Sequence, residues 1–335
     1  MKSLVKRLKK YKLLYLVLLV AMAYYFVMLY IPIFWGFELS FKEMKIGSTI
    51  SGAPWVGLQN YKYVFSNPEI FKLLKNTLFI SVCRLVFTTI PPILLTIAIF
   101  DLKNKAYQKF CQTMVYIPHF FSWVIIYGIV YAFFSGNGFV NGIIRMFGGQ
   151  PENFLTSSKA FVPLLIGSQL WKEVGWNTIL YFAALTSVDT QLYEAAKIDG
   201  AGPIQRVKAV TFPAMKPVIT FSLIMALGNI LNNDFEQILL FYNSAVYEVG
   251  DVIDTWVYRV GLGQMQYGVG SAVSMLKAVI SLVLILSPTR FQRKQPDVNV
   301  LRKEEGYEKE YSSEGIKIKN VTRGNCLPRF SLQLW

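Results

Sequence analysis

The stretch Val188–Pro217, VDTQLYEAAKIDGAGPIQRVKAVTFPAMKP, is a long charged interruption between two apolar segments, and its local signals predict a helical hairpin. Its first part, residues 192–198, favours a helix with apolar side chains on one side. Asp199–Gly202 should end that helix, because glycine tolerates the positive φ of a helix terminus. Pro203 can begin a second helix, since its missing N–H would be unpaired there anyway. We expect the second helix to stop at residues 211–213, before the next apolar segment.

The composition indicates an integral membrane protein. Of the 335 residues, 53% are hydrophobic and only 16% are charged, whereas soluble domains carry about 25% charged residues. The net charge of +14 would suggest nucleic acid in a soluble protein. Cys83, Cys111 and Cys326 have neither an even count nor metal-ligand spacing, so neither a disulfide framework nor a metal site is predicted. The single histidine, His119, excludes a histidine pair or triad.

Six apolar runs are long enough to cross a membrane as helices. About 20 apolar residues at 1.5 Å each span the ~30 Å hydrocarbon layer, and continuous apolar runs do not fit the alternating pattern of a barrel. The first run follows the basic segment 1–12 and is too long for a signal peptide. Prolines at 32, 91, 92 and 118 mark expected bending points. The predicted spans are residues 13–37, 74–100, 110–134, 161–186, 218–242 and 267–287.

The distribution of Lys and Arg orients this predicted bundle. With a cytoplasmic N-terminus, the inner segments hold 23 Lys and Arg and the outer loops hold 8, and such an excess marks the cytoplasmic side. We therefore expect an all-α protein of six transmembrane helices with both termini inside and the stretch 188–217 in the cytoplasm. The outer loops would be 38–73, 135–160 and 243–266. The positive charge is then mainly topological, and no nucleic-acid partner is expected.

The central stretch carries a recognisable motif. Its elements are Glu194-Ala195-Ala196, Asp199-Gly200-Ala201, Arg206 and Val210-Thr211-Phe212-Pro213. This pattern resembles the EAA motif of permease subunits of binding-protein-dependent ABC importers, with Phe212 in place of the usual Leu. The run Gly57-Leu58-Gln59-Asn60-Tyr61 resembles the sugar-importer branch, and within it the permeases for oligosaccharides or polysaccharide fragments. The resemblance covers the chain from its first helix to about Leu286.

The resemblance implies a type I permease architecture for residues 13–287, in which the loop 188–217 forms a coupling helix that docks on a cytosolic ATPase subunit. ATP binding would switch the spans between inward-open and outward-open states. The residues assigned to this coupling are Glu194, Ala195, Ala196, Asp199, Gly200, Ala201, Arg206 and Pro213. The chain contains no G-x-x-x-x-G-K-[ST] phosphate loop, so ATP and Mg²⁺ would be used by the partner. The chain itself would bind no cofactor and would not be an enzyme.

The same resemblance implies a set of partners in the cytoplasmic membrane. They are a second, homologous permease forming a heterodimer, a dimer of ATPase subunits, and an extracytoplasmic solute-binding protein that meets the outer loops. The expected function is import of a carbohydrate of oligosaccharide size. The alternatives are an ion-coupled secondary transporter, which predicts an inverted repeat and a charged relay in the membrane, and an ABC permease for another solute class.

Polar residues in the fifth predicted span are candidates for the solute path, because intramembrane polar groups are expensive. At 100° per residue, Asn229, Asn233 and Glu236 or Gln237 would share one helical face. Amides and carboxylates bind sugar hydroxyls, and aromatic rings pack on sugar C–H faces. The alternatives are amides that tie helices together and tryptophans in an interfacial belt. The candidates are Asn229, Asn232, Asn233, Asp234, Glu236 and Gln237, with Trp171, Trp176 and Tyr181 from the fourth span.

Other charged residues and the tail complete the prediction. Arg84 and Lys277 lie deep enough in spans to need ion-pair partners, while Lys172 and Glu173 could pair with each other or lie at the outer mouth. His119 is expected to be packed or hydrogen-bonded rather than to relay protons. The tail 288–335 is expected to be disordered or atypical. Either a regulatory extension or a frame error near the 3′ end of the gene would explain its composition.

Overall fold

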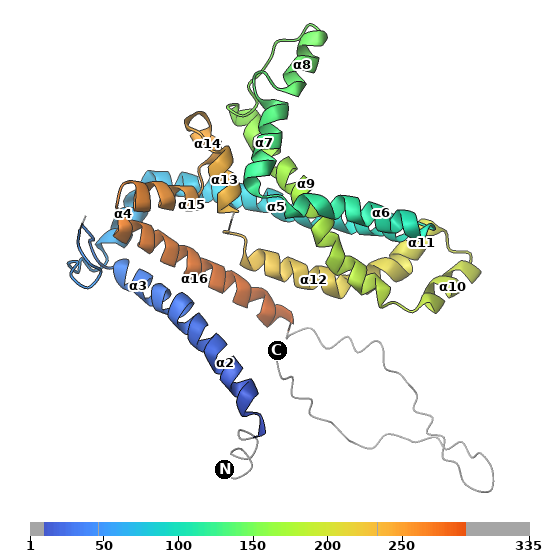
Figure 1. Cartoon of the computed structure of the whole chain (residues 1–335), viewed down its shortest axis with the longest axis horizontal. Coiled ribbons are helices and arrows are strands. Elements are labelled where there is room, and N and C mark those ends of the chain that lie inside the picture. Colours follow the sequence, from blue (N-terminus) through green and yellow to red (C-terminus); the bar gives the residue numbers. More distant parts are fainter. Residues whose placement is uncertain (1–9, 46, 233, 293–335) are drawn as a thin grey trace. The chain divides into compact units, whose positions relative to one another are not determined.

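The computed structural model describes residues 10–45, 47–232 and 234–292, and this part of the chain is mostly helical (Figure 1). The chain divides into two units, residues 1–288 and 289–335, and the features described here belong to the first. The all-α prediction is confirmed for the described residues. The prediction for the tail 288–335 can be compared only over residues 288–292, which are helical, and residues 293–335 and 1–9 fall outside the described part.

Most of the helices follow one another closely along the chain. The longer ones are α2 (Lys12–Tyr25), α3 (Ile31–Leu39), α5 (Pro68–Phe100), α6 (Lys105–Tyr116), α7 (Trp123–Phe134), α9 (Ser158–Thr186), α12 (Phe212–Gly228) and α16 (Tyr267–Gln292). The shorter ones are α4 (Gln59–Ser66), α8 (Phe139–Met146), α10 (Thr190–Ile198), α11 (Pro203–Arg206), α13 (Phe235–Phe241), α14 (Tyr247–Gly250) and α15 (Ile253–Trp256). The described residues also contain three π-helical turns, Phe26–Tyr30, Val207–Thr211 and Val257–Gly263, and two 3₁₀ turns, Ile117–Phe120 and Ser244–Val246.

Five helical stretches of the described residues are long and apolar enough to cross a membrane. They are Lys12–Leu39, Pro68–Phe100, Trp123–Met146, Pro203–Gly228 and Tyr267–Leu286. Helix α9, predicted as the fourth span, is 29 residues long but is not among the five. Its middle carries Gln169, Lys172 and Glu173. A helix that is largely covered by other helices tolerates such residues, because they find partners inside the protein.

The third predicted span is two helices rather than one. Helix α6 ends at Tyr116, a 3₁₀ turn holds Pro118, and α7 begins at Trp123. Proline has no N–H and its ring clashes with the preceding turn, so it ends a helix unless the backbone is re-satisfied. The predicted bending point at Pro118 is therefore confirmed, and the continuous helix over 110–134 is wrong. In contrast, Pro91 and Pro92 lie inside the unbroken α5.

The fifth predicted span is both displaced and broken. The helix that begins at Pro203 continues through a π-helical turn into α12 and ends at Gly228, so the predicted stop at residues 211–213 is wrong. The π-helical turn lies directly before Pro213, where a wider turn accommodates the proline ring. The chain leaves the helix at Asn229 and resumes it at Phe235. Asn and Asp, which compete with the backbone for hydrogen bonds, make up four of residues 229–234.

Helices α5 and α9 run side by side and carry the main core (Figure 1). Ile80 of α5, Leu165 of α9 and Ile238 of α13 are fully buried in one cluster. Helix α9 also passes very close to α6 at Gly175, where an added Cβ would lie 1.9 Å from the Val115 carbonyl oxygen. Any side chain at Gly175 would therefore push the two helices apart. The α5–α9 pair is the rigid element around which the polar residues of the interior are arranged.

Candidate functional site

The hairpin predicted from the stretch 188–217 forms around Gly200. Helix α10 begins with Asp189, whose Oδ1 accepts a hydrogen bond from Gln191 N at 2.9 Å. It ends with Gly200 N donating to Lys197 O at 3.1 Å and Ala201 N donating to Ala196 O at 2.9 Å. This pair of bonds is a Schellman motif, which needs a left-handed residue at the position of Gly200. Its φ is +75°, so the predicted turn is confirmed.

The surface of this hairpin is open. Glu194, Ala195 and Asp199 are exposed, and Ala196, Ala201 and Arg206 are half-buried. The side chains of Glu194 and Asp199 make no hydrogen bond or ion pair to other described residues. Ile198 and Ile204 expose 86% and 72% of their surface, although isoleucine is among the residues most often buried. The hairpin therefore presents two carboxylates without partners among the described residues, together with exposed apolar side chains.

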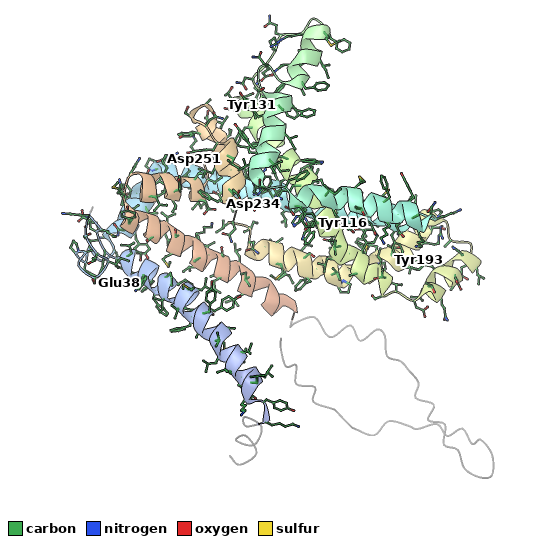
Figure 2. The ribbon with its side chains drawn as sticks, viewed as in Figure 1. Glu38, Tyr116, Tyr131, Tyr193, Asp234 and Asp251 are labelled. Atoms are coloured by element: carbon green, nitrogen blue, oxygen red, sulfur yellow. The ribbon has the colours of Figure 1, made fainter. Side chains whose placement is uncertain are left out.

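One side chain fastens the hairpin to the helices behind it. Tyr193, labelled in Figure 2, places its hydroxyl 3.1 Å from Thr211 Oγ1 in the π-helical turn. The Tyr193 ring lies 6.2 Å from the ring of Phe100 at the end of α5. Pro213 lies just beyond this contact, in the first turn of α12. The hairpin is thus attached through its inner face while its outer face is free.

The predicted polar residues of the fifth span lie around the helix break rather than along one helical face. Asn229 ends α12 and donates from Nδ2 to Met225 O at 3.1 Å. Asn232 Nδ2 donates to Asn229 Oδ1 at 3.3 Å. Asp234 begins α13, where Figure 2 labels it, and Glu236 is exposed on the same helix. Asn233 lies outside the described residues. The predicted shared face is wrong for Asn229, Glu236 and Gln237, because the break separates Asn229 from the helix that carries the other two.

Arg84 gathers polar side chains from α9 and α13 around its guanidinium. Arg84 Nη2 donates to Gln237 Oε1 at 2.5 Å, and Arg84 Nη1 lies 3.5 Å from Asp234 Oδ2. Gln237 is fully buried and its Nε2 donates to Leu165 O at 2.8 Å and to Ser168 Oγ at 2.9 Å. The ion pair predicted for Arg84 is confirmed, and its partner comes from the far side of the helix break.

The fifth member of this group is Gln169, which was not among the predicted site residues. Its Nε2 donates to Asp234 Oδ2 at 3.4 Å. Arg84, Ser168, Gln169, Asp234 and Gln237 are called the Arg84 cluster below. Arg84 and Gln169 are 6% and 8% exposed, yet Arg84 Nε and Gln169 Oε1 have no hydrogen-bond partner within the described residues. An unpaired buried polar atom costs about 1–3 kcal/mol, so the cluster has unused hydrogen-bonding capacity beside the break.

The two predicted tryptophans of α9 line different cavities. Trp176 stacks on His119 with 4.1 Å between ring centroids and 5° between planes. It lines a cavity of about 500 Å³ whose other walls include Thr88, Asn177 and Tyr181. Trp171 lines a cavity of about 460 Å³ among mostly aliphatic and phenylalanine side chains, with Ser168 as the one polar side chain. Of the two cavities, that of Trp176 has several polar side chains in its walls.

The charged residues beside Trp176 bind the turn that contains Pro118. His119 Nδ1 lies 2.9 Å from Glu173 Oε2, so His119 is packed and hydrogen-bonded as predicted. Lys172 Nζ donates to the carbonyl oxygens of His119 and Phe121 at 2.6 and 2.7 Å. The predicted Lys172–Glu173 contact is present, but at 3.9 Å it is the weaker one. Elsewhere, Lys277 pairs with Asp254, as expected for an ion pair within the helices.

The run 57–61 has a structural role at the end of the first long helix. Asn60 Nδ2 donates to the carbonyl oxygens of Ser40 and Lys42 at 2.9 and 3.0 Å, and Tyr61 OH donates to Ser40 Oγ at 2.8 Å. A Cβ at Gly268 would lie 2.7 Å from Asn60 Nδ2. The run thus joins the end of α3 to α4 and to the start of α16.

Comparison with known proteins places these features in a family. Residues 77–295 match the family described as binding-protein-dependent transport system inner membrane component. The chain is 39% identical over 294 residues to the polygalacturonan/rhamnogalacturonan transport system permease protein YteP of Bacillus subtilis (strain 168), covering 88% of this chain and 91% of that protein. It is 27% identical over 258 residues to the arabinooligosaccharides transport system permease protein AraP of the same organism, covering 76% and 80%.

Solved structures resemble the fold over most of its length. A chain from a bacterial ABC transporter involved in the import of the acidic polysaccharide alginate gives a TM-score of 0.81 at 36% identity, covering 88% of this chain and 99% of that chain. A chain from the alginate transporter in complex with a periplasmic protein bound to alginate pentasaccharide gives 0.79 at 36% identity, covering 86% and 96%.

The matched region contains the hairpin, the helix break and the Arg84 cluster. The resemblance to permeases of ABC importers, found from the EAA motif, and to their sugar-importer branch, found from the run 57–61, is thereby confirmed. The relatives are transport permeases rather than enzymes. With five apolar helices of spanning length among its described residues, this chain is a multi-pass membrane protein and belongs to the family of binding-protein-dependent transport system inner membrane components.

Proposed function

We propose that this chain is the membrane subunit of an ABC importer that moves a carbohydrate of oligosaccharide size across the cytoplasmic membrane. The observation that carries the proposal is the likeness, over 88% of the chain and at a TM-score of 0.81, to a permease chain of the alginate importer. The curated relatives at 39% and 27% identity are named for transport of polygalacturonan, rhamnogalacturonan and arabinooligosaccharides. A carbohydrate polymer fragment is the solute common to all of them.

The proposed topology has six spans with both termini in the cytoplasm. Helix α9, which is not among the five most apolar long helices, supplies the remaining span, since it has 29 residues and packs along α5. The excess of Lys and Arg in the inner segments supports the orientation. In this arrangement the hairpin at Gly200 faces the cytoplasm, and the loops 38–73, 135–160 and 243–266 face outward.

The hairpin is proposed to dock on a separate ATPase subunit, which would use ATP and Mg²⁺. Its free face offers Glu194 and Asp199 as carboxylates for basic side chains of a partner, with small side chains at Ala195, Ala196 and Ala201 that permit close approach. Ile198 and Ile204 add an exposed apolar contact. Burying apolar surface at the centre of an interface, with charges at its rim, is the usual arrangement of a docking site.

The helix geometry suggests how a docked hairpin would act on the interior. Pro203 to Gly228 is one helical stretch of 26 residues, which at 1.5 Å per residue is about 39 Å long. Arg206, which is half-buried, and Pro213 lie in its first turns. Its far end is the break at Asn229, next to the Arg84 cluster. A movement of the hairpin would therefore be transmitted to the break along one continuous helical stretch.

The solute path is proposed to pass the helix break and the cavity lined by Trp176. Broken helices in membrane proteins are tolerated where their free backbone groups face protein or a water-filled cavity. Asn229, Asn232, Asn233, Asp234, Glu236 and Gln237 would offer paired hydrogen bonds to sugar hydroxyls, and Trp176 with Tyr181 would offer ring faces. Trp171, in its apolar cavity, is assigned to packing rather than to sugar contact.

The proposed partners are a second homologous permease in a heterodimer, an ATPase dimer and an extracytoplasmic binding protein. The periplasmic protein in the alginate transporter complex supports the last of these. Two ion pairs hold the proposed outer loop 243–266 in place for such a contact. Arg259 pairs with Glu69 at 3.0 Å and with Asp251 at 2.7 Å. Burial opposes the charge of Arg259, but the hydrogen bond and attraction from Asp251, with attraction from Tyr242 and Glu69, raise its pKa.

The test is ATP hydrolysis by the assembled system. The chain would be co-expressed with its neighbouring permease, ATPase and binding-protein genes, purified, and placed in vesicles. We expect ATPase activity that rises several-fold when the binding protein is loaded with the correct oligosaccharide. Uptake that persists when the proton gradient is collapsed would agree with this. Uptake that stops with the gradient while ATP is still present would contradict the proposal and favour a secondary transporter.

A further inference from the structure

A groove of about 990 Å³ runs between α5 and α9, apart from the cavity lined by Trp176. Two apolar stripes form its walls, and neighbouring members of each stripe are four residues apart, which places them on one helical face. The stripe of α5 is Phe79, Cys83 and Phe87, and the stripe of α9 is Val162, Ile166 and Leu170. These six wall positions carry no charged side chain and only one weakly polar group, the Cys83 thiol.

The beginning of both helices forms a cationic rim for this groove. Lys72 and Lys75 come from the first turns of α5, and Lys159 comes from the first turn of α9. All three are exposed, and none forms an ion pair within the described residues. Glu248 is the single acidic residue among those lining the groove. Two helix N-termini add partial positive charge at the same end.

We propose that this groove binds an anionic phospholipid, with the headgroup phosphate at the lysine rim and an acyl chain along the apolar stripes. From Lys75 to Phe87 the helix advances by twelve residue steps, about 18 Å at 1.5 Å per step, which is close to one leaflet, half of the ~30 Å hydrocarbon layer. Lysines near the membrane surface attract anionic headgroups. The inference concerns a lipid site and goes beyond the transport function.

The other occupants fit the groove less well. A sugar would find no paired hydrogen-bonding groups along the apolar stripes. An apolar helix of a second permease would cover the rim, and the lysines there would lose water without gaining a counter-charge, which is unfavourable. An anionic lipid satisfies both ends at once, because its phosphate matches the rim and its hydrocarbon matches the walls.

Native mass spectrometry of the full chain with its assembled subunits tests the site. The complex would be taken from discs containing phosphatidylglycerol and phosphatidylcholine. Lys72→Gln/Lys75→Gln/Lys159→Gln would be compared with a control, Lys45→Gln/Lys62→Gln/Lys103→Gln, which alters three exposed lysines outside the groove. We expect the wild type and the control to retain phosphatidylglycerol, and the groove variant to lose its preference for it by about tenfold or more. Equal preference in all three proteins would overturn the proposal.

Cys83 gives a second measurement within the groove. With Cys326 replaced by Ser, a lipid-permeable maleimide would react with Cys83 and with Cys111, which lies on α6 and serves as an internal control. We expect phosphatidylglycerol to slow labelling of Cys83 several-fold relative to phosphatidylcholine and to leave Cys111 unchanged. If Cys83 is fully protected in both lipids, a neighbouring subunit covers the groove and the proposal is wrong.

Discussion

The Gly200 hairpin and the Arg84 cluster use similar residue types in opposite ways. In the hairpin, Glu194 and Asp199 lie in the open, and neither side chain bonds to another described residue. In the cluster, Arg84 and Gln237 are buried and each bonds across to another helix. Polar side chains without partners inside the chain are available to another protein, whereas buried and bonded ones are committed to holding helices together. The two regions therefore predict different responses to mutation.

The change expected to affect stability most is Arg84→Met. It removes the 2.5 Å partner of Gln237, which is fully buried, and the counter-charge of Asp234. A buried acceptor left unpaired costs about 1–3 kcal/mol, and the half-exposed Asp234 adds little because water screens it. We expect a loss of about 2 kcal/mol in the free energy of unfolding, seen as a lower thermal midpoint in detergent and less protein in the membrane fraction.

The control for this change is Arg145→Met, which removes an exposed arginine from α8. Its effect should stay within about 1 kcal/mol. A double-mutant cycle of Arg84→Met with Gln237→Met should give a coupling energy of about 0.5–3 kcal/mol, as for residues in one network. Additive effects, or equal losses at Arg84 and Arg145, would show that the cluster does not hold these helices together.

The second change, Gly200→Pro, acts on the hairpin. Proline fixes φ near −65° and cannot adopt +75°, and it removes the N–H that bonds to Lys197. We expect a rearranged end of α10, roughly 1–3 kcal/mol of local strain, normal insertion in the membrane, and loss of both transport and co-purifying ATPase. Gly200→Asn should be milder, because Asn tolerates the left-handed region.

Gly148 provides a matched control for the backbone. It has a φ of +76° and ends α8 with the same pair of bonds, from Gly148 N to Arg145 O and from Gly149 N to Ile144 O. Gly148→Pro therefore applies a similar backbone strain at another helix end. We expect it to keep the ATPase in co-purification. If Gly148→Pro and Gly200→Pro released the ATPase equally, or if Gly200→Pro transported normally, docking through the hairpin would be wrong.

The third change separates the two tryptophans of α9. Trp176→Ala should cost about 1–2 kcal/mol in stability, because it removes the stacking on His119 and part of an aromatic side chain's buried surface. We expect it also to reduce oligosaccharide uptake severalfold at matched abundance. Trp171→Ala, in the apolar cavity, should lower abundance without changing uptake per molecule. If Trp176→Ala and Trp171→Ala reduced uptake per molecule equally, the assignment of the solute path to the cavity of Trp176 would be wrong.

The sequence predicted the Gly200 turn and the start of the second helix well because their signals are local, although the end predicted for that helix at residues 211–213 is wrong. Gly200 as a left-handed residue and Pro203 as a helix start each act within a few residues of their position, whereas the cap at Asp189 was not predicted. The same reasoning failed at the fifth span, where a polar stripe was expected on an unbroken helix. Four Asn and Asp residues among positions 229–234 are a turn composition, and that signal would have found the break.

The Arg84 cluster could be predicted only in part. An arginine in an apolar run requires a partner, but nothing in the sequence indicates which one, because Gln237 lies 153 positions away. Gln169 and Ser168 were missed because α9 was treated as one more apolar span, although its polar residues mark a helix that packs against several others. Partners of this kind depend on how helices pack, which no local pattern contains.

The smallest effect on stability is expected for Glu194→Gln, and it sharpens the comparison most directly. Glu194 is exposed and its side chain bonds to no described residue, so the free energy of unfolding should change by less than about 0.5 kcal/mol. If its carboxylate pairs with a basic side chain of the ATPase, the variant should bind that subunit more weakly. Its affinity should also fall less steeply with added salt than that of the wild type. Glu43→Gln, which changes an exposed glutamate between α3 and α4, is the control. A Glu194→Gln chain that is less stable but couples normally would assign Glu194 to the hairpin's own structure, which is the behaviour expected of the Arg84 cluster and not of a docking surface.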